Sequence, residues 1–169
     1  GNNDGYPYLK FQLQFLIPIT QEPVAGDGTI GNPYQIASLK NLCWIAESDE
    51  RWGDHYIQTA DIDASETADW YWGQGWLPIG NETSSFTGSY DGEGHTITGL
   101  EIRRYETDYI GLFGAASGAT IQNLGFIDIY VSGGSYVGGL AGKLINTDVT
   151  DCYIAGYVAG YSYVGGLVG

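Results

Sequence analysis

The sequence predicts a mostly β protein, a right-handed parallel β-helix with one short α-helix on its N-terminal side. Composition is the first indication, because 27 of the 169 residues are Gly and 14 are Tyr, while charged residues make up only 15%. Such a chain favours short strands joined by tight turns. The other two observations are an internal repeat and a single stretch with helical spacing.

The repeat is clearest in three segments that begin with Tyr and end with Gly. Residues 109–114, 136–142 and 163–169 have the sequences YIGLFG, YVGGLAG and YVGGLVG, and successive tyrosines are 27 residues apart. A period in the twenties is typical of one turn of a β-solenoid, whose stacked turns share a core. Apolar positions that recur between turns are therefore expected to face inward. They are Ile97, Leu100, Ile102, Leu112, Ile121, Leu124, Leu140, Val149, Ile154 and Leu167.

Residues 37–48 have helical spacing, since Leu39, Leu42, Cys43 and Ala46 follow the i, i+3, i+4, i+7 pattern. Ser38 is the expected N-cap of this helix. One amphipathic helix ahead of a solenoid can cover the exposed core of its first turn. We therefore predict a capping helix.

Strands are predicted over residues 55–63, 76–80 and 86–90, with an aromatic loop over 64–75. In residues 126–131 apolar and polar types suggest a simple alternation, with even-numbered residues on one face and odd-numbered residues on the other.

In the N-terminal segment, residues 9–15 alternate strictly between apolar and polar types, and Pro18 then breaks the pattern. A two-faced strand of this kind either adds to a sheet edge of a neighbouring module or subunit, or folds back along its own helix. We divide the chain into a strand and linker over 1–23, a capping module over 24–80 and repeats over 81–169. The expected assembly strand has Leu9, Phe11, Leu13, Phe15 and Ile17 on its apolar face.

Several segments together carry a family resemblance. Residues 28–36, 77–80 and 86–100, followed by the YVGGLVG-type units, resemble GLUG-motif proteins in the same order, and residues 1–12 resemble the end of such a module. The resemblance implies a tandem array in a large bacterial surface or secreted protein, often adhesin-like. It implies no catalytic residues, and a fold alone does not fix a function.

The charge balance argues against two classes of binding partner. The net charge is −14 with only 6 Lys and Arg residues, which argues against nucleic acid and against docking on an anionic membrane. No apolar run is long enough to span a membrane. Cys43 and Cys152 are expected as buried thiols rather than as a disulfide.

Three carboxylates are weak calcium candidates. Asp61, Asp63 and Asp91 have the oxygen ligands that Ca²⁺ prefers, although ordinary turn chemistry explains the same residues. Asp63, Asp91 and His95 also form a conceivable acid–base set for a carbohydrate-active enzyme. We expect no enzyme and no resident cofactor, because no Arg or Lys lies close to this set in the sequence.

The aromatic loop contains Trp70 and Trp72. We expect this loop to form a hydrophobic lid over the first turns, or else to expose both rings so that they can stack on glycans. Trp76 is assigned to the core. Asn81 begins an Asn-Glu-Thr glycosylation sequon. The leading hypothesis is an extracellular stalk or fibre segment that serves adhesion and contacts neighbouring copies or modules. The alternative is a carbohydrate-binding or carbohydrate-active β-helical protein.

Overall fold

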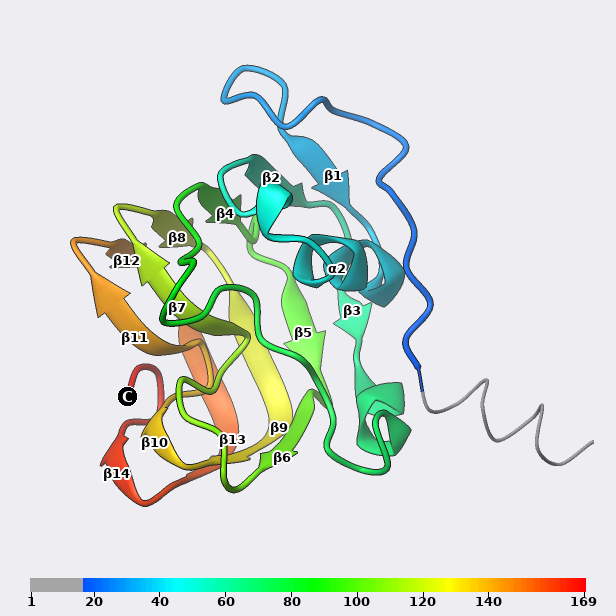
Figure 1. The fold of residues 1–169 in the computed structure, drawn as a ribbon. Coiled ribbons are helices and arrows are strands. Elements are labelled where there is room, and N and C mark those ends of the chain that lie inside the picture. The colour runs from blue at the N-terminus through cyan, green and yellow to red at the C-terminus, as the bar shows by residue number, and fades with distance from the viewer. Residues whose placement is uncertain (1–16) are drawn as a thin grey trace, which may run out of the picture.

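The computed structural model describes residues 17–169 as a mostly β chain with one α-helix, which confirms that part of the prediction. The sheets are parallel and curl around a shared core (Figure 1). The helices are α2 (Leu39–Ala46) and the 3-10 helices η1 (Asp49–Arg51) and η2 (Ser65–Asp69). The strands are β1 (Tyr34–Ile36), β2 (His55–Gln58), β3 (Ile62–Asp63), β4 (Ser89–Asp91), β5 (Thr96–Thr98), β6 (Glu101–Arg104), β7 (Phe113–Ser117), β8 (Thr120–Gln122), β9 (Gly125–Gly133), β10 (Ser135–Val137), β11 (Ala141–Ile145), β12 (Asp148–Thr150), β13 (Tyr153–Ala159) and β14 (Ser162–Val164).

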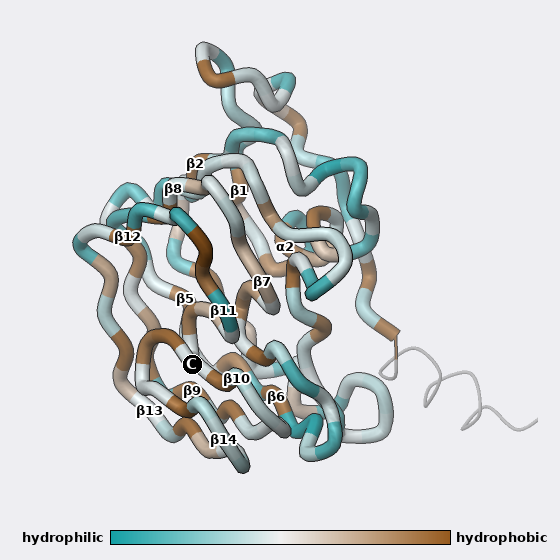
Figure 2. The backbone as a smooth tube through the Cα atoms, turned by 60° about the vertical axis from the view of Figure 1, so that its left-hand side comes forward, coloured by the Kyte–Doolittle hydropathy of each residue, from teal (hydrophilic) through white to brown (hydrophobic). Residues whose placement is uncertain are grey.

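Strands pair with the strands that precede or follow them by one repeat. The two larger sheets have the orders β1-β2-β4-β8-β12 and β13-β9-β5-β3, and the smaller ones are β10-β14 and β11-β7. Tyr56 pairs with Tyr90, and Tyr90 pairs with Ile121, so inward residues stack upon inward residues. In Figure 2 neighbouring segments such as β9 and β13 lie side by side. Parallel pairing thus satisfies the backbone between segments that are far apart in sequence.

The predicted inward positions form the core. Ile97, Leu100, Ile102, Leu112, Ile121, Leu124 and Leu140 are fully buried, as expected. Val149, Ile154 and Leu167 pack against the same cluster but are only partly buried. These three belong to the last strands and the segment after them, where no later strand within the described residues covers them.

The predicted helix is present as α2. The Ser38 hydroxyl oxygen accepts a hydrogen bond from the Asn41 N–H at 3.4 Å, so Ser38 is the N-cap as predicted. The apolar face of α2 joins the core at the end of the molecule where β1 and β3 lie (Figure 1). Burial raises the pKa of the Cys43 thiol to about 12, which makes it an unreactive core group. Both cysteines are free.

Three predicted strands were wrong in extent. Residues 55–63 form β2 and β3 with a break between them, where the buried Gln58 amide donates to the Ala60 carbonyl. Residues 76–80 make only an isolated bridge, from Ile79 to Phe113. Pro78 has no N–H for a ladder and Gly80 has a φ of +77°, so this segment cannot continue as a strand. Residues 86–90 overlap β4, which begins only at Ser89.

The alternation predicted for residues 126–131 was also wrong. Asp128 has a φ of +53° and lies outside the pairing, while β5 pairs with the first part of β9 and β6 with the second. Because this bulge shifts the phase by one residue, Phe126, Ile129 and Val131 are all buried.

Candidate functional site

Three tyrosines from successive repeats stack face to face on the surface. The ring centroids of Tyr109 and Tyr136 are 4.9 Å apart with planes at 4°, and those of Tyr136 and Tyr163 are 4.6 Å apart with planes at 6°. All three have positive φ, at 62°, 58° and 53°. We call these three residues the tyrosine column. It marks the same point of the repeat in three turns.

The last glycine of each repeat unit explains part of this geometry. A Cβ added to Gly114 would lie 2.9 Å from the carbonyl oxygen of Tyr109, and one added to Gly142 would lie 2.5 Å from that of Tyr136. One added to Gly169 would lie 2.7 Å from the Tyr163 carbonyl oxygen. Real side chains do not fit at such distances, so the unit closes on its own tyrosine only with Gly in this position.

Polar groups flank the column. The Tyr109 hydroxyl donates to a Glu82 carboxylate oxygen at 2.9 Å, and this hydrogen bond is the main cause that raises the pKa of Tyr109. The Lys143 ammonium is 5.7 Å from the Tyr109 ring centroid and 5.6 Å from that of Tyr136. The column is therefore a built surface feature with a carboxylate and an ammonium beside it.

The last turn leaves an open end. Within residues 17–169, β12, β13 and β14 each lie at one edge of a sheet. The Tyr163 and Val164 side chains are exposed there, and a hollow of about 550 Å³ opens between β13 and the segment after β14. Its lining comes from Cys152, Tyr153, Ile154, Gly156, Val158, Val164, Gly165, Gly166 and Leu167. Unpaired backbone and apolar side chains thus lie together, which is the combination that a further strand layer would cover.

A groove runs across the outer face of β2, β4 and β8, with mostly polar side chains on the sheet and Ile30 and Pro33 on its hairpin side. In-register pairing places His55 beside Ser89 and Ser89 beside Thr120, with a second row parallel to them. The short hairpin Thr29–Asn32 stands over one side, and the hollow measures about 310 Å³. Outward residues at the groove are His55, Ile57, Ser89, Asp91, Thr120 and Gln122.

Hydrogen bonds fix the polar groups of this groove. His55 Nδ1 is 2.7 Å from the Ser89 hydroxyl oxygen, and the Asp91 carboxylate accepts from Gln122 Nε2 at 2.6 Å and Asn123 Nδ2 at 2.9 Å. Burial raises the pKa of Asp91, but these hydrogen bonds and one from the Glu93 N–H hold it below its usual value. The groove lining contains no Lys or Arg. It therefore offers neutral donors and acceptors beside one carboxylate.

The carboxylates of the calcium candidates accept hydrogen bonds from the protein, within a turn for Asp63 and across the sheet for Asp61. Asp61 accepts from the Thr96 N–H at 2.9 Å and lies 3.3 Å from His95 Nδ1, while Asp63 accepts from the Ser65 N–H at 2.9 Å. Asp91 belongs to β4, in the other large sheet. Among residues 17–169 no three His, Cys, Asp or Glu side chains come together as metal ligands.

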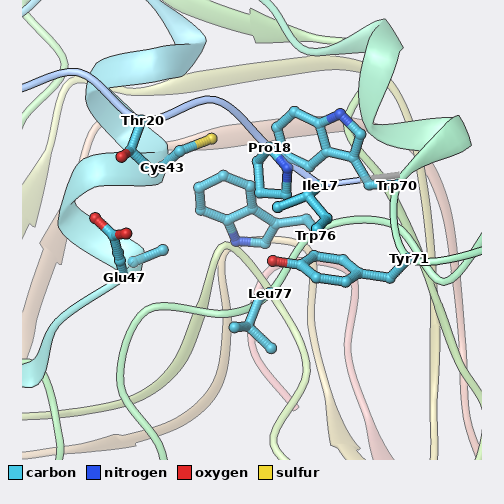
Figure 3. A pocket seen from close by; sticks show the side chains of 10 residues that line it. Ile17, Pro18, Thr20, Cys43, Glu47, Trp70, Tyr71, Trp76 and Leu77 are labelled. Atoms are coloured by element: carbon cyan, nitrogen blue, oxygen red, sulfur yellow. The ribbon is translucent and has the colours of Figure 1, made fainter. Parts of the chain in front are cut away.

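The two candidate glycan-binding tryptophans differ in exposure. Trp72 is 82% exposed, whereas Trp70 is only 4% exposed, so the alternative in which both rings are exposed was wrong for Trp70. The Trp70 indole packs against the Trp76 indole, with ring centroids 6.3 Å apart. Trp76 is buried in the core, as predicted. Both rings line an apolar pocket of about 200 Å³ together with Ile17 and Pro18 (Figure 3). The aromatic loop thus forms a lid with one exposed ring.

The assembly-strand residues Leu9, Phe11, Leu13 and Phe15 lie outside the described residues. Ile17 is described, lies in a bend and is 60% exposed. The tyrosine column was not predicted as a site, although the 27-residue spacing of its members is visible in the sequence. It also missed the groove, whose residues come from strands that only the register brings together.

Two relatives resemble much of the chain. Halomucin of Haloquadratum walsbyi is 44% identical over 123 residues, which cover 69% of this chain and 1% of that protein. A protein of Evansella cellulosilytica named as a Gly-rich membrane protein is 35% identical over 112 residues, or 63% of this chain and 12% of that protein. The chain therefore spans a small part of either relative. No family model and no solved structure matches it. Among residues 17–169, no helix has the length and apolar character to cross a membrane.

Proposed function

We propose that the chain is a segment of a right-handed, GLUG-type β-helix that serves as a stalk or fibre in an extracellular or cell-surface protein. The observation that carries this proposal is the in-register stacking of successive repeats, seen most clearly in the tyrosine column. Stacked repeats contact only their neighbours and can be extended without limit, which suits a rod. In this proposal α2 and residues 24–80 close one end, and the chain has no catalytic role.

The comparisons support this proposal. Halomucin carries a mucin name, and the chain matches only about 1% of its length, so a chain of this type can occur within a very long protein. The second relative is named as a Gly-rich membrane protein. A surface location fits both names, and an acidic net charge of −14 favours a soluble, well-hydrated surface.

The occupant proposed for the open end is one more turn of the same repeat, from an adjoining module or a second copy. A next tyrosine would stack on the free face of Tyr163, which is 66% exposed. Parallel strands would then pair with β12, β13 and β14 about 4.8 Å away. The hollow would be filled by the inward residues of that turn.

Sedimentation velocity and electron microscopy test this arrangement. The purified chain is expected to form elongated end-stacked particles as concentration rises, and the native protein to form rods with a strand repeat of about 4.8 Å along the axis. Val164→Lys places a charge on the open end and should lower self-association at least about tenfold.

A matched substitution provides the control. Val24 is also an exposed valine, far from the open end, and Val24→Lys should leave self-association unchanged. The same effect from both variants would show that charge alone acts. Compact, dispersed particles of the native protein would overturn the stalk proposal. If the native protein forms rods but the isolated chain stays monomeric, the covering turn comes from an adjoining module and not from a second copy.

Glycan binding is a second candidate function, which the polar groove favours. Rows of hydroxyl, imidazole, amide and carboxylate groups lie on a rigid sheet beside the exposed Ile30 of the hairpin. The single carboxylate and the absence of Lys and Arg from the lining disfavour uronic acids. A neutral oligosaccharide is therefore the expected ligand class.

An oligosaccharide array that contains neutral and uronic-acid chains tests the groove. Binding of neutral members is expected, and Thr120→Arg, which fills the groove, should weaken it at least about tenfold. Thr83→Arg, at an exposed loop position outside the groove lining, is the control. If Trp72→Ala abolishes binding and Thr120→Arg does not, the aromatic loop and not the groove is the site.

A further inference from the structure

We propose that the tyrosine column is a site of oxidative cross-linking, where a peroxide-driven one-electron oxidation joins Tyr136 to Tyr163, or Tyr109 to Tyr136, as dityrosine. The proposal goes beyond the stalk function and does not depend on it. It follows from three phenol rings that the fold holds in contact on neighbouring strands.

The geometry removes the need for a diffusional encounter. Tyr136 and Tyr163 lie between the paired residues Ser135↔Ser162 and Val137↔Val164, so their backbones are one strand spacing apart. The two rings are nearly parallel, with centroids at 4.6 Å. Groups held in this way react as though at very high local concentration. Tyr163 is the exposed member, so an oxidant reaches the column from this ring.

A proton acceptor is present at the other end of the column. The Tyr109 hydroxyl already donates to a Glu82 carboxylate oxygen at 2.9 Å. When a phenol loses an electron it also loses its proton, and the carboxylate is placed to accept it. The Lys143 ammonium near Tyr109 and Tyr136 opposes a positive charge on the rings, which favours neutral phenoxyl radicals.

The reaction balances with hydrogen peroxide as the oxidant and a haem peroxidase as its catalyst. Each of two tyrosines gives up one electron and its phenolic proton, and the two phenoxyl radicals form a bond between ring carbons ortho to the hydroxyls. The hydrogen on each of those carbons then moves to the oxygen and restores the phenol. Peroxide takes up two electrons and two protons and becomes two water molecules, so the protein loses two hydrogen atoms.

Such a bond would tie one turn of the repeat to the next. Unfolding would no longer separate these turns, because a covalent link closes a loop of 27 residues between Tyr136 and Tyr163. The oxidised chain should therefore resist denaturant and proteolysis better than the reduced chain.

The test treats the dilute full chain with peroxidase and hydrogen peroxide, and follows dityrosine fluorescence and peptide mass spectra. A monomer lighter by two hydrogen atoms is expected, with linked peptides that contain Tyr136 and either Tyr163 or Tyr109. Tyr136→Phe keeps the stacked ring but cannot form the phenoxyl radical, so it should lower the yield of these links at least about tenfold.

Tyr161→Phe is the matched control, since Tyr161 is 80% exposed and no stacked aromatic partner is found for it within residues 17–169. This variant should form the column links at the wild-type rate. Links that follow exposure, with Tyr161 as the main partner, would overturn the proposal. So would consumption of tyrosine without a link inside the column. Far-ultraviolet circular dichroism establishes that both variants are folded.

Discussion

Trp76→Ala is expected to destabilise the chain by about 3–5 kcal/mol, the range for removal of a buried Trp side chain. Trp76 is 1% exposed and packs against Trp70, so truncation opens a large cavity under the aromatic loop. Its indole Nε1 also donates to the Leu112 carbonyl at 3.1 Å, and this acceptor would lose its partner. Urea unfolding followed by circular dichroism measures the change.

Trp72→Ala is the matched control for this substitution. The Trp72 ring is exposed, so its removal should change stability by less than about 0.5 kcal/mol. Equal losses from the two variants would contradict the assignment of Trp70 and Trp76 to a lid over the core. A large loss from Trp76→Ala alone would show that the aromatic loop is structural, with only Trp72 left for a contact to ligand.

The repeat made the core predictable. Apolar residues such as Leu100, Leu124 and Leu140 recur at repeat positions, and each turn must bury the same face, so periodicity alone identified them. The helix α2 was predictable for a similar reason, because its apolar spacing and its N-cap Ser38 are local signals. The apolar spacing and the N-cap are local to the helix, so they predict it without knowledge of how the strands pair.

Features that depend on a few local dihedral angles were not predictable. The bulge at Asp128 exchanges the inward and outward positions within β9. An Asp at an outward position of a strand is common, so the residue type alone does not indicate a bulge. The burial of Trp70 depends on Trp76, six residues later, with a tight turn between them. The groove depends on register, since His55, Ser89 and Thr120 are more than thirty residues apart in sequence.

The same distinction explains the tyrosine column. Its 27-residue spacing is a sequence signal, but the near-parallel stacking of the rings requires the positive φ of each Tyr and the close approach of a Gly. The repeat unit is thus conformationally demanding at both of its ends. Its glycines are predicted to be more important for stability than their small size suggests.

Gly142→Ala is the substitution that tests this view, with an expected loss of about 3 kcal/mol or more. A Cβ on Gly142 would lie 2.5 Å from the Tyr136 carbonyl oxygen and 2.6 Å from the Ile110 backbone nitrogen. Both neighbours are backbone atoms, and Ile110 lies in the preceding turn, where it bridges to Val137, so relief requires separation of two turns. Urea unfolding measures the loss, and near-ultraviolet circular dichroism should register the disturbed stack of Tyr109 and Tyr136.

Gly53→Ala separates this clash from the general effect of a Gly replacement. A Cβ on Gly53 would meet only the Thr87 hydroxyl oxygen, at 3.6 Å, which is ordinary contact, so a change within about 0.5 kcal/mol is expected. If Gly142→Ala were tolerated equally well, the repeat units could not be closing against their own tyrosines. The closure would then arise from the inward apolar residues alone, and the stacked column would be a consequence of the fold with no part in holding it.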